Sequence, residues 1–396
     1  MNQLQYIKEA AKQATEEKLT HLEHAEDHPL NAGSEGYQHV AKTLNGVHDA
    51  LQGKKSSTSI TTKYDGSPSI IFGRHPESGK FFVATKSAFN KTPKINYSPA
   101  DIDANHGHAP GLAAKLKTVL KHLPKVTPQT GVFQGDVMHS GGKSASNPEG
   151  DVVVHGGQAH FTPNTISYST RDPKETDTAR KSKLGVAVHT AYHGSSFEKM
   201  KAVYNAGHSG FGDHPDVHLM DVTSSKGSID PKQSKAFQTH MAKAEEIHKA
   251  LEKTGGYKAL DNHSDHMKTY INKTVRTGDR PSVEGYKEHL SDLHQGLADK
   301  VKTPDKKQEK LKAGKELTSH VDKNALHFEN ILALHHHIQS AKNELVGALS
   351  ANPNYEHRVG EQEVKPEGHV AVIGNRPTKL VDRAEFSKLN FAKNAK

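Results

Sequence analysis

Two stretches of this chain have the residue pattern of β-strands, and a long stretch with a helical pattern separates them. The first β-rich stretch covers about residues 59–190, and the second covers about residues 368–381. Between about residues 230 and 350, apolar residues recur three and four positions apart, which is the spacing of one face of a helix. We therefore expect an α+β protein whose core of antiparallel sheets is interrupted by a large helical insertion and completed near the end of the sequence.

Periodicity and turn residues predict the individual elements. The apolar positions from Tyr37 to Leu51 recur at helical spacing, and Gly53 is placed to end that helix. Apolar runs on both sides of residues 76–79 predict a β-hairpin. Strands are expected at 69–72, 81–84, 131–137, 151–154, 165–168, 184–188, 368–373 and 379–381, and a helix at 112–123. Further helices are expected around 286–301 and 331–349, with the lysine-rich segment 302–315 as a loop or a frayed helix.

These elements suggest four segments along the chain. They are an N-terminal helical segment at 1–55, the first part of the core at 56–195, a mainly helical insertion at 196–354, and the completion of the core at 355–396.

Composition excludes several kinds of protein. The 396 residues include no cysteine, which removes disulfides, thiolate nucleophiles and cysteine-based zinc sites. No run of about 18 apolar residues is present, so we expect no membrane span. Residues 1–17 are charged and lack the apolar stretch of a signal peptide, which favours a cytoplasmic location. A formal charge of +8 suits a polyanionic partner such as nucleic acid, although it is also compatible with a plain solubility surplus.

The sequence Lys63-Tyr64-Asp65-Gly66-Ser67 offers a nucleophile beside a tight turn. A lysine amine attacks electrophiles once it loses its proton, and neighbouring cations or desolvation promote that loss. Glycine permits a turn that brings the backbone close to a bound phosphate. The alternative is a solvent-facing strand lysine beside an ordinary Asp-Gly turn.

In sequence order, several short segments resemble the motifs of the covalent nucleotidyltransferase superfamily, which contains ATP-dependent DNA and RNA ligases and mRNA capping enzymes. The matching segments are Lys63-Tyr64-Asp65-Gly66-Ser67, Ala84-Thr85-Lys86-Ser87, Phe133-Gln134-Gly135-Asp136-Val137, residues 184–189, Glu367-Gly368-His369-Val370 and Thr378-Lys379-Leu380-Val381.

The resemblance implies a role for each matching residue. Lys63 would be the catalytic nucleophile that forms a lysyl-AMP intermediate. The nucleotide-binding residues would be Asp65, Gly66, Lys86, Asp136, Lys379 and Arg383. Glu367 and Asp136 would hold the metal ion, Mg²⁺ or Mn²⁺, and ATP would be the nucleotide.

Some features depart from the superfamily pattern. The aromatic residue that usually stacks on adenine is not evident in residues 184–189, and Val381 stands where a second lysine is usual, with Arg383 as a possible substitute. Few residues follow Lys379, which leaves no room for the additional domain of DNA ligases and capping enzymes. An RNA ligase-like enzyme is therefore the expectation.

The whole chain also resembles a family of largely uncharacterised tailed-bacteriophage proteins. The matching segments are residues 21–27, 161–166 and 379–383, the last followed by Phe386-Ser387. If the chain is phage-encoded, its location would be the host cytoplasm.

The first functional hypothesis is an ATP-dependent RNA ligase-type nucleotidyltransferase that seals or modifies nucleic-acid ends, with RNA favoured over DNA. The alternative is an inactive ligase-like phage protein that binds nucleic acid or serves in assembly. Transfer of the nucleotide to a protein or a small molecule also fits the motifs. Histidine clusters at His263 and His266 and at residues 335–337 are interpreted as surface or capping residues, because none has the spacing of a helical zinc site.

Overall fold

The structure is a computed structural model, and it describes residues 22–145, 147–224, 227–350, 352–360 and 362–385. The chain divides into two compact units. Unit 1 contains residues 56–227 and 349–379 together with Leu22, and unit 2 contains residues 23–55 and 228–348 and the segment from 380 onwards.

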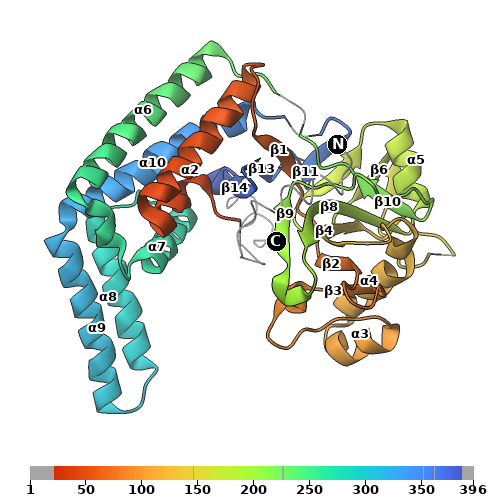
Figure 1. The fold of residues 1–396 in the computed structure, drawn as a ribbon, viewed down its shortest axis with the longest axis horizontal. Coiled ribbons are helices and arrows are strands. Elements are labelled where there is room, and N and C mark those ends of the chain that lie inside the picture. The colour runs from red at the N-terminus through yellow and green to blue at the C-terminus, as the bar shows by residue number, and fades with distance from the viewer. Residues whose placement is uncertain (1–21, 146, 225–226, 351, 361, 386–396) are drawn as a thin grey trace. The chain divides into compact units, whose positions relative to one another are not determined.

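The largest sheet of unit 1 has six strands (Figure 1). Its order is β10 (Val217–Met220), β8 (Leu184–His193), β4 (Val132–His139), β2 (Ser69–Arg74) and β3 (Phe81–Ala84), and β9 (Lys201–Tyr204) also pairs with β8. β10 runs parallel to β8, and the other pairs are antiparallel.

Two smaller antiparallel sheets complete unit 1. One consists of β1 (Ser59–Lys63), β13 (Gly368–Ile373) and β14 (Arg376–Leu380). The other consists of β12 (Gln362–Glu363), β11 (Tyr355–Val359), β7 (Ser167–Thr170), β6 (Gln158–Phe161) and β5 (Val153–His155). Strands separated by the helical segment of the sequence therefore pair with strands from the first β-rich stretch.

Both faces of the six-stranded sheet are covered. Ile70 and Phe72 of β2 belong to one buried cluster, which includes residues of helix α4 (Pro110–His122), whereas Ile71 belongs to a second cluster on the other face. An apolar run is expected for a strand that is buried on both sides. Helix α3 (Pro99–His106) packs beside α4, and α5 (Pro173–Lys181) contacts the five-stranded sheet.

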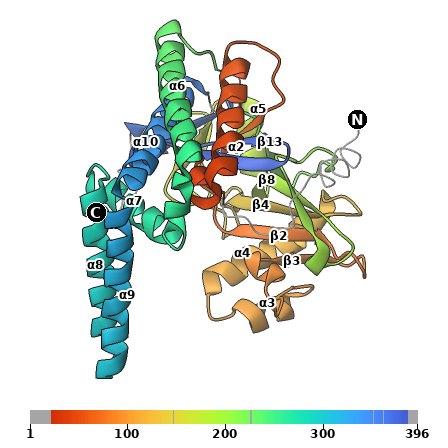
Figure 2. The same cartoon turned by 60° about the vertical axis from the view of Figure 1, so that its left-hand side comes forward.

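Unit 2 is helical (Figures 1 and 2). Its helices are α2 (His28–Leu51), α6 (Pro231–Thr254), α7 (Ser264–Thr277), α8 (Val283–Asp299), α9 (Pro304–Lys323) and α10 (Ala325–Ala348). α10 packs against α6 and α2, while α8 and α9 form a hairpin. Gly314 of α9 allows this close approach, because a Cβ there would lie 2.7 Å from the Cβ of His294.

A buried cluster of ion pairs in unit 2 joins the residues before α2 to α10 and to the segment after β14. Lys342 of α10 is fully buried and donates hydrogen bonds of 2.9 and 3.0 Å to the two carboxylate oxygens of Glu26. Asp27 pairs with His335 at 3.3 Å and also with Arg383. Two acids at the start of the unit are thus neutralised by bases from α10 and from the segment after β14.

The expected α+β class and the main helices are confirmed, and the strand expected at 368–373 matches β13. Of the two alternatives expected for segment 302–315, the helix is the one found, because α9 runs without interruption from Pro304 to Lys323. The helical insertion does not begin at residue 196, since β9 and β10 belong to the six-stranded sheet. Within the described residues, no helix combines the length and apolar character needed to cross a membrane.

Candidate active site

A cavity of about 380 Å³ lies in unit 1, and Lys63 is one of its lining residues. Pockets for small molecules are typically between about 300 and 1,000 Å³. The lining includes six of the residues singled out from the sequence: Lys63, Asp65, Gly66, Lys86, Asp136 and Lys379. The structure therefore brings together side chains from three separate parts of the chain.

Lys63 is the last residue of β1, and strand pairing determines its neighbour. β1 runs antiparallel to β13 with Lys63 opposite Gly368. The preceding residue, Glu367, is consequently placed beside the lysine, and the Nζ of Lys63 donates a hydrogen bond to Oε2 of Glu367. The lysine side chain is one-quarter exposed, whereas the Glu367 side chain is only 5% exposed. The amine thus faces the cavity, and the carboxylate lies behind it.

The turn after Lys63 is held tightly against β4. A Cβ on Gly66 would lie 2.5 Å from the Cβ of Asp136 and 2.8 Å from the sulfur of Met138, so only glycine fits. The backbone N–H of Ser67 donates to the carbonyl of Val137 at 2.9 Å. These contacts fix the distance between the turn that follows Lys63 and the strand that carries Asp136.

The carboxylate of Asp65 holds the Lys63 turn against a neighbouring segment, which the motif alone does not predict. Its Oδ1 accepts a hydrogen bond from the amide of Asn164 at 2.9 Å, and its Oδ2 accepts from the backbone N–H groups of Thr165 and Ile166 at 2.8 and 3.1 Å. The carboxylate therefore ties the turn to the segment that precedes β7. Both of its oxygens are occupied by this contact.

Tyr64 anchors the same turn in an aromatic cage. Its hydroxyl donates to the carbonyl of Asp221 at 2.9 Å, and its ring lies 5.6 Å from Tyr168 and 6.0 Å from Tyr355, centroid to centroid. His357 stacks on the Tyr64 ring at 6.2 Å. The turn is thus supported by residues of β7 and β11.

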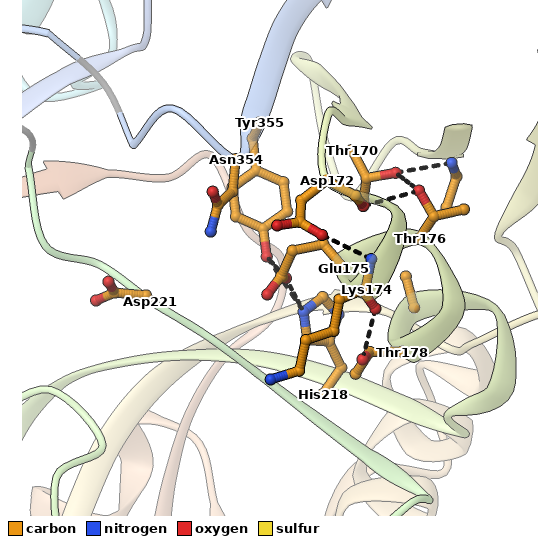
Figure 3. Close-up of polar contacts among 12 residues, drawn as sticks. Thr170, Asp172, Lys174, Glu175, Thr176, Thr178, His218, Asp221, Asn354 and Tyr355 are labelled. Carbon is orange, nitrogen blue, oxygen red and sulfur yellow. Dashed lines mark hydrogen bonds and ion pairs between the residues drawn. The ribbon is translucent and has the colours of Figure 1, made fainter. Parts of the chain in front are cut away.

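Tyr355, one of these aromatic residues, belongs to a polar network with Glu175 and His218 (Figure 3). The hydroxyl of Tyr355 and the ring of His218 meet at the carboxylate of Glu175, with His218 Nε2 2.8 Å from Oε2. The other ring nitrogen of His218 lies 3.0 Å from Nε2 of His139 on β4. The network therefore connects α5, β11, β10 and β4 beneath the Lys63 turn.

The small sheet that carries Lys63 is also joined directly to the large sheet. Asn375, in the turn between β13 and β14, donates to the carbonyl of Ala202 at 2.8 Å and accepts from the N–H of Tyr204 at 3.2 Å. The Oγ1 of Thr61 on β1 donates to Asn205 at 2.9 Å. Because Tyr204, Asn205 and Thr61 all line the cavity, these bonds close one of its sides.

Three lysines reach the cavity from different elements. Lys63 comes from the end of β1, Lys86 from the turn after β3, and Lys379 from β14. A concave site with several ammonium groups attracts anions, since the low-dielectric walls concentrate the field. Asp65, Asp136 and the Glu367 bonded to Lys63 offset the formal charge of these lysines, so the site offers both cationic and anionic groups to a ligand.

Two carboxylates near Lys63 have pKa values shifted in opposite directions. Burial raises the pKa of Glu367 above its ordinary value, although the charges of Lys63 and Lys379 oppose that rise. Burial also acts to raise the pKa of Asp136, but the His189 imidazole and the Lys63 ammonium outweigh it and hold that pKa below its ordinary value. Asp136 is therefore a stable anion, and Glu367 is the better proton acceptor of the two.

A β-bulge brings in residues that the sequence analysis missed. In the pairing of β4 with β8, Gly135 lies opposite Val188 and Gln134 lies opposite Thr190, so His189 is the extra residue. Before the bulge, even-numbered residues of β8 such as Val188 face the buried core. After it, Thr190 and Tyr192 line the cavity. Bulges often redirect side chains beside active sites.

Tyr192 is an aromatic residue of the cavity wall, and it lies just beyond residues 184–189. Its hydroxyl donates to Oε1 of Gln134 at 2.6 Å, and both residues line the cavity. His189 also lines the cavity, with Nε2 3.7 Å from Oδ2 of Asp136. If the side chains of β8 alternated strictly between its two faces, Thr190 and Tyr192 would be expected to face the buried core. The bulge at His189 reverses the alternation and turns them to the cavity.

Arg383, expected among the nucleotide-binding residues, is paired with acidic residues of unit 2. It is not among the residues that line the cavity, and its guanidinium pairs with Asp27 and lies 3.7 Å from Glu26 in unit 2. The expected metal ligands, Asp136 and Glu367, are both close enough to Lys63 for its charge to affect their pKa values. Among the described residues, no group of three or more His, Asp or Glu side chains is arranged to hold a metal ion.

The histidines interpreted as surface residues are partly buried. His263 is 1% exposed and lies 2.8 Å from the hydroxyl of Tyr286, and His335 is 4% exposed beside Asp27. These rings serve as polar core residues of unit 2. Burial lowers the pKa of His263 to about 4, so the ring is neutral at neutral pH.

The fold and the cavity define an α+β protein with a pocket lined by both lysines and aspartates. The chain belongs to a family of unknown function (DUF6267), whose model matches residues 19–396. No curated protein and no solved structure matches the chain.

Proposed function

We propose that this protein is an ATP-dependent nucleotidyltransferase of RNA ligase type, with Lys63 as the residue that becomes covalently linked to the nucleotide. The core of unit 1 would then be a ligase-type nucleotidyltransferase core. The observation that carries the proposal is the meeting of Lys63, Lys86 and Lys379 with Asp136 around one cavity, with Glu367 bonded to the lysine. These are the residues that the ordered motifs single out, and they come from strands far apart in the sequence.

In the proposed first step, Nζ of Lys63 attacks the α-phosphorus of ATP. A nitrogen–phosphorus bond forms, the bond from the α-phosphorus to the bridging oxygen breaks, and pyrophosphate leaves. Lys63 loses a proton in this step, and Glu367 is the acceptor because its carboxylate is bonded to Nζ and burial raises its pKa. Lys86 and Lys379 stabilise the charge that develops on the phosphate oxygens.

In the second step, a 5′-phosphate oxygen of the acceptor attacks the same phosphorus and breaks the bond to Lys63. A 3′-hydroxyl then attacks the activated 5′-phosphate and displaces AMP, which seals the strand. The preference for RNA over DNA and for ATP over GTP rests on the resemblance of the motifs.

A divalent cation fits the donors around Lys63. Mg²⁺ is commonly held by one or two carboxylates, with substrate phosphates and water as the other ligands. Asp136 and Glu367 would be those carboxylates, since both lie within the electrostatic reach of Lys63. When bound, the ion would supply charge neutralisation at the phosphate groups.

Covalent labelling tests the proposal. The full chain is incubated with Mg²⁺ and α-labelled ATP or GTP, and label that survives denaturation is measured alongside the intact mass. We expect a nucleotidyl adduct in the wild type, none in Lys63→Ala, and an unchanged adduct in Lys55→Ala, which removes an exposed lysine outside the cavity.

Lack of an adduct after pyrophosphate treatment, which strips nucleotide already attached, would overturn the proposal. It would favour the non-enzymatic alternative, a phage protein that binds nucleic acid or serves in assembly. Circular dichroism of Lys63→Ala, compared with the wild type, separates loss of labelling from loss of fold.

A further inference from the structure

A loop beside the cavity has an unusual composition. Between β3 and α3, residues 85–97 contain three lysines and no acidic residue, and the nearest acids in the sequence are Glu77 and Asp101. This loop leaves the end of β3 at the cavity, where Lys86 lines the wall, and returns to pair Asn96 with Val83. Within the described residues, Lys80, Lys86, Lys91 and Lys94 form no ion pair, and all four are exposed. Their charges are therefore available to an external anion.

Aromatic rings accompany these lysines in a continuous series. Tyr192, in the cavity wall, lies 4.9 Å from Phe89, which lies 6.0 Å from Phe197. Phe197 lies 5.2 Å from His75, and His75 lies 6.0 Å from Tyr97, all measured between ring centroids. Tyr97 is 39% exposed, while Phe89 and Phe197 are half-buried. Tyr192, Phe89 and Phe197 pack with a buried cluster of the large sheet, so Tyr97 is the exposed ring at the outer end of the series.

We propose that Tyr97, together with Lys86, Lys91 and Lys94, forms the binding track for a single strand of nucleic acid whose end enters the cavity. The inference rests on the proposed function, because it takes the cavity as the place where that end reacts. Single-strand sites combine a positive groove along the backbone with aromatic rings on which bases stack.

The features of the loop favour a single strand over other polyanions. A purely ionic partner would need only the lysines, whereas an exposed tyrosine ring offers a stacking face to an unpaired base. Bases of a duplex are stacked on one another and are not available to such a ring. Single-stranded chains therefore match both the charge and the ring.

Fluorescence anisotropy with the full chain tests the track. The probes are a labelled 5′-phosphorylated single-stranded RNA of about 12 nucleotides, its DNA counterpart and the matching duplexes, each over a range of salt concentrations. We expect at least about tenfold tighter binding of the single strands than of the duplexes. Charge reversal in Lys91→Glu/Lys94→Glu should weaken single-strand binding at least about tenfold. It should also make the slope of log binding constant against log salt concentration shallower by about one to two.

Variants at Tyr97 separate stacking from charge. Tyr97→Ala should weaken single-strand binding by about fivefold or more, and Tyr97→Phe should bind like the wild type, because it keeps the ring. The matched control is Lys232→Glu/Lys235→Glu, which reverses two exposed lysines of α6 and should change binding little. Duplex binding as tight as single-strand binding, an unaffected Tyr97→Ala, or an equal loss in the control would each overturn the track.

Labelling at Lys63 is measured in the same variants and separates the two proposals. Lys91→Glu/Lys94→Glu should still form the nucleotidyl adduct, since neither lysine lines the cavity. If the wild type forms no adduct but the binding pattern holds, the proposed chemistry fails and the track stands. If the adduct forms and the binding pattern does not hold, the track fails and the chemistry stands.

Discussion

Lys63 and Glu367 are 304 positions apart in the sequence, yet a hydrogen bond joins their side chains. The pairing of β1 with β13 produces this contact, because it sets Lys63 opposite Gly368. The pair places an amine at the wall of the cavity and a buried carboxylate behind it. Its chemistry is the central point of the proposed function.

Replacing Glu367 by Gln should slow labelling of Lys63. The amide keeps the shape of the side chain but cannot accept the proton that the lysine loses, and loss of a general base typically costs about 10²–10⁴ in rate. The measurement is the initial rate of adduct formation. Glu363→Gln, at an exposed position on β12, is the control and should label at the wild-type rate. An unchanged rate in Glu367→Gln would show that the carboxylate takes no part in the step.

Replacing Gly66 by Ala should displace the Lys63 turn. The new methyl group would lie 2.5 Å from the Cβ of Asp136, and such overpacking costs about 1–3 kcal/mol. We expect a lower free energy of unfolding and a loss of labelling. Gly111→Ala is the control, because no atom lies within 4 Å of a Cβ at that position of α4. Urea unfolding and the labelling assay check both expectations, and a Gly66→Ala protein with normal labelling would contradict the tight contact with β4.

Replacing Lys342 by Met should destabilise unit 2 strongly. The change leaves the fully buried carboxylate of Glu26 without its two hydrogen bonds, and breaking a buried pair from one side costs about 3–5 kcal/mol. Urea unfolding followed by circular dichroism at a helix wavelength measures the loss. The double variant Glu26→Gln/Lys342→Met should recover much of it, whereas the exposed Lys323→Met should match the wild type. Equal stability of the two single variants would contradict this account.

Stability should fall as the pH is lowered from about 6.5 to about 4. Burial lowers the pKa values of His263, His357 and His369 to about 4, and an unfolded histidine has a pKa near ~6.5. Between these two values the unfolded chain takes up protons that the folded chain does not, so stability rises with pH across this window and is lost as pH falls. Below pH 4, each ring has lowered the free energy of unfolding by roughly 3 kcal/mol relative to its value above pH 6.5.

His357→Phe tests this pH dependence at one site. Neither ring nitrogen of His357 has a hydrogen-bond partner, so phenylalanine keeps the stacking on Tyr64 and loses no hydrogen bond. The slope of unfolding free energy against pH should decrease by about 1.4 kcal/mol per pH unit between pH 4 and 6.5. His193→Phe, at an exposed position, is the control. An unchanged slope in His357→Phe would contradict the depressed pKa.

The parts of the fold that the sequence predicts are those with strong local patterns. The apolar stripe of α10 and the apolar run of β13 are long enough to identify without tertiary information. Strands β9, β11 and β12 were not predicted, because they have two to five residues and are stabilised by their neighbours in the sheet. The lysine-rich start of α9 left a loop and a frayed helix as alternatives, because the sequence does not show the contacts that α9 makes with α8.

The residues of the candidate site also differ in whether the sequence alone predicts them. Lys63, Gly66 and Asp136 lie in recognisable short motifs, so the order of the sequence was enough to select them. The position of Tyr192 in the cavity wall is set by a bulge that reverses the alternation of side chains along β8. The bulge in turn exists only in the pairing of β8 with β4, which the sequence does not show. Arg383 was grouped with Lys379 by proximity in sequence, but the partners that determine its role, Asp27 and Glu26, lie more than 350 positions away.

The late position of β13 has a consequence for synthesis of the protein. At about 5–20 residues per second, the ribosome needs roughly 15–60 s to make the 304 residues between Lys63 and Glu367. Throughout that time the nascent chain has the lysine without its carboxylate, and β1 has no β13 to pair with. The cavity can therefore assemble only after the sequence of every helix from α2 to α10 has been translated.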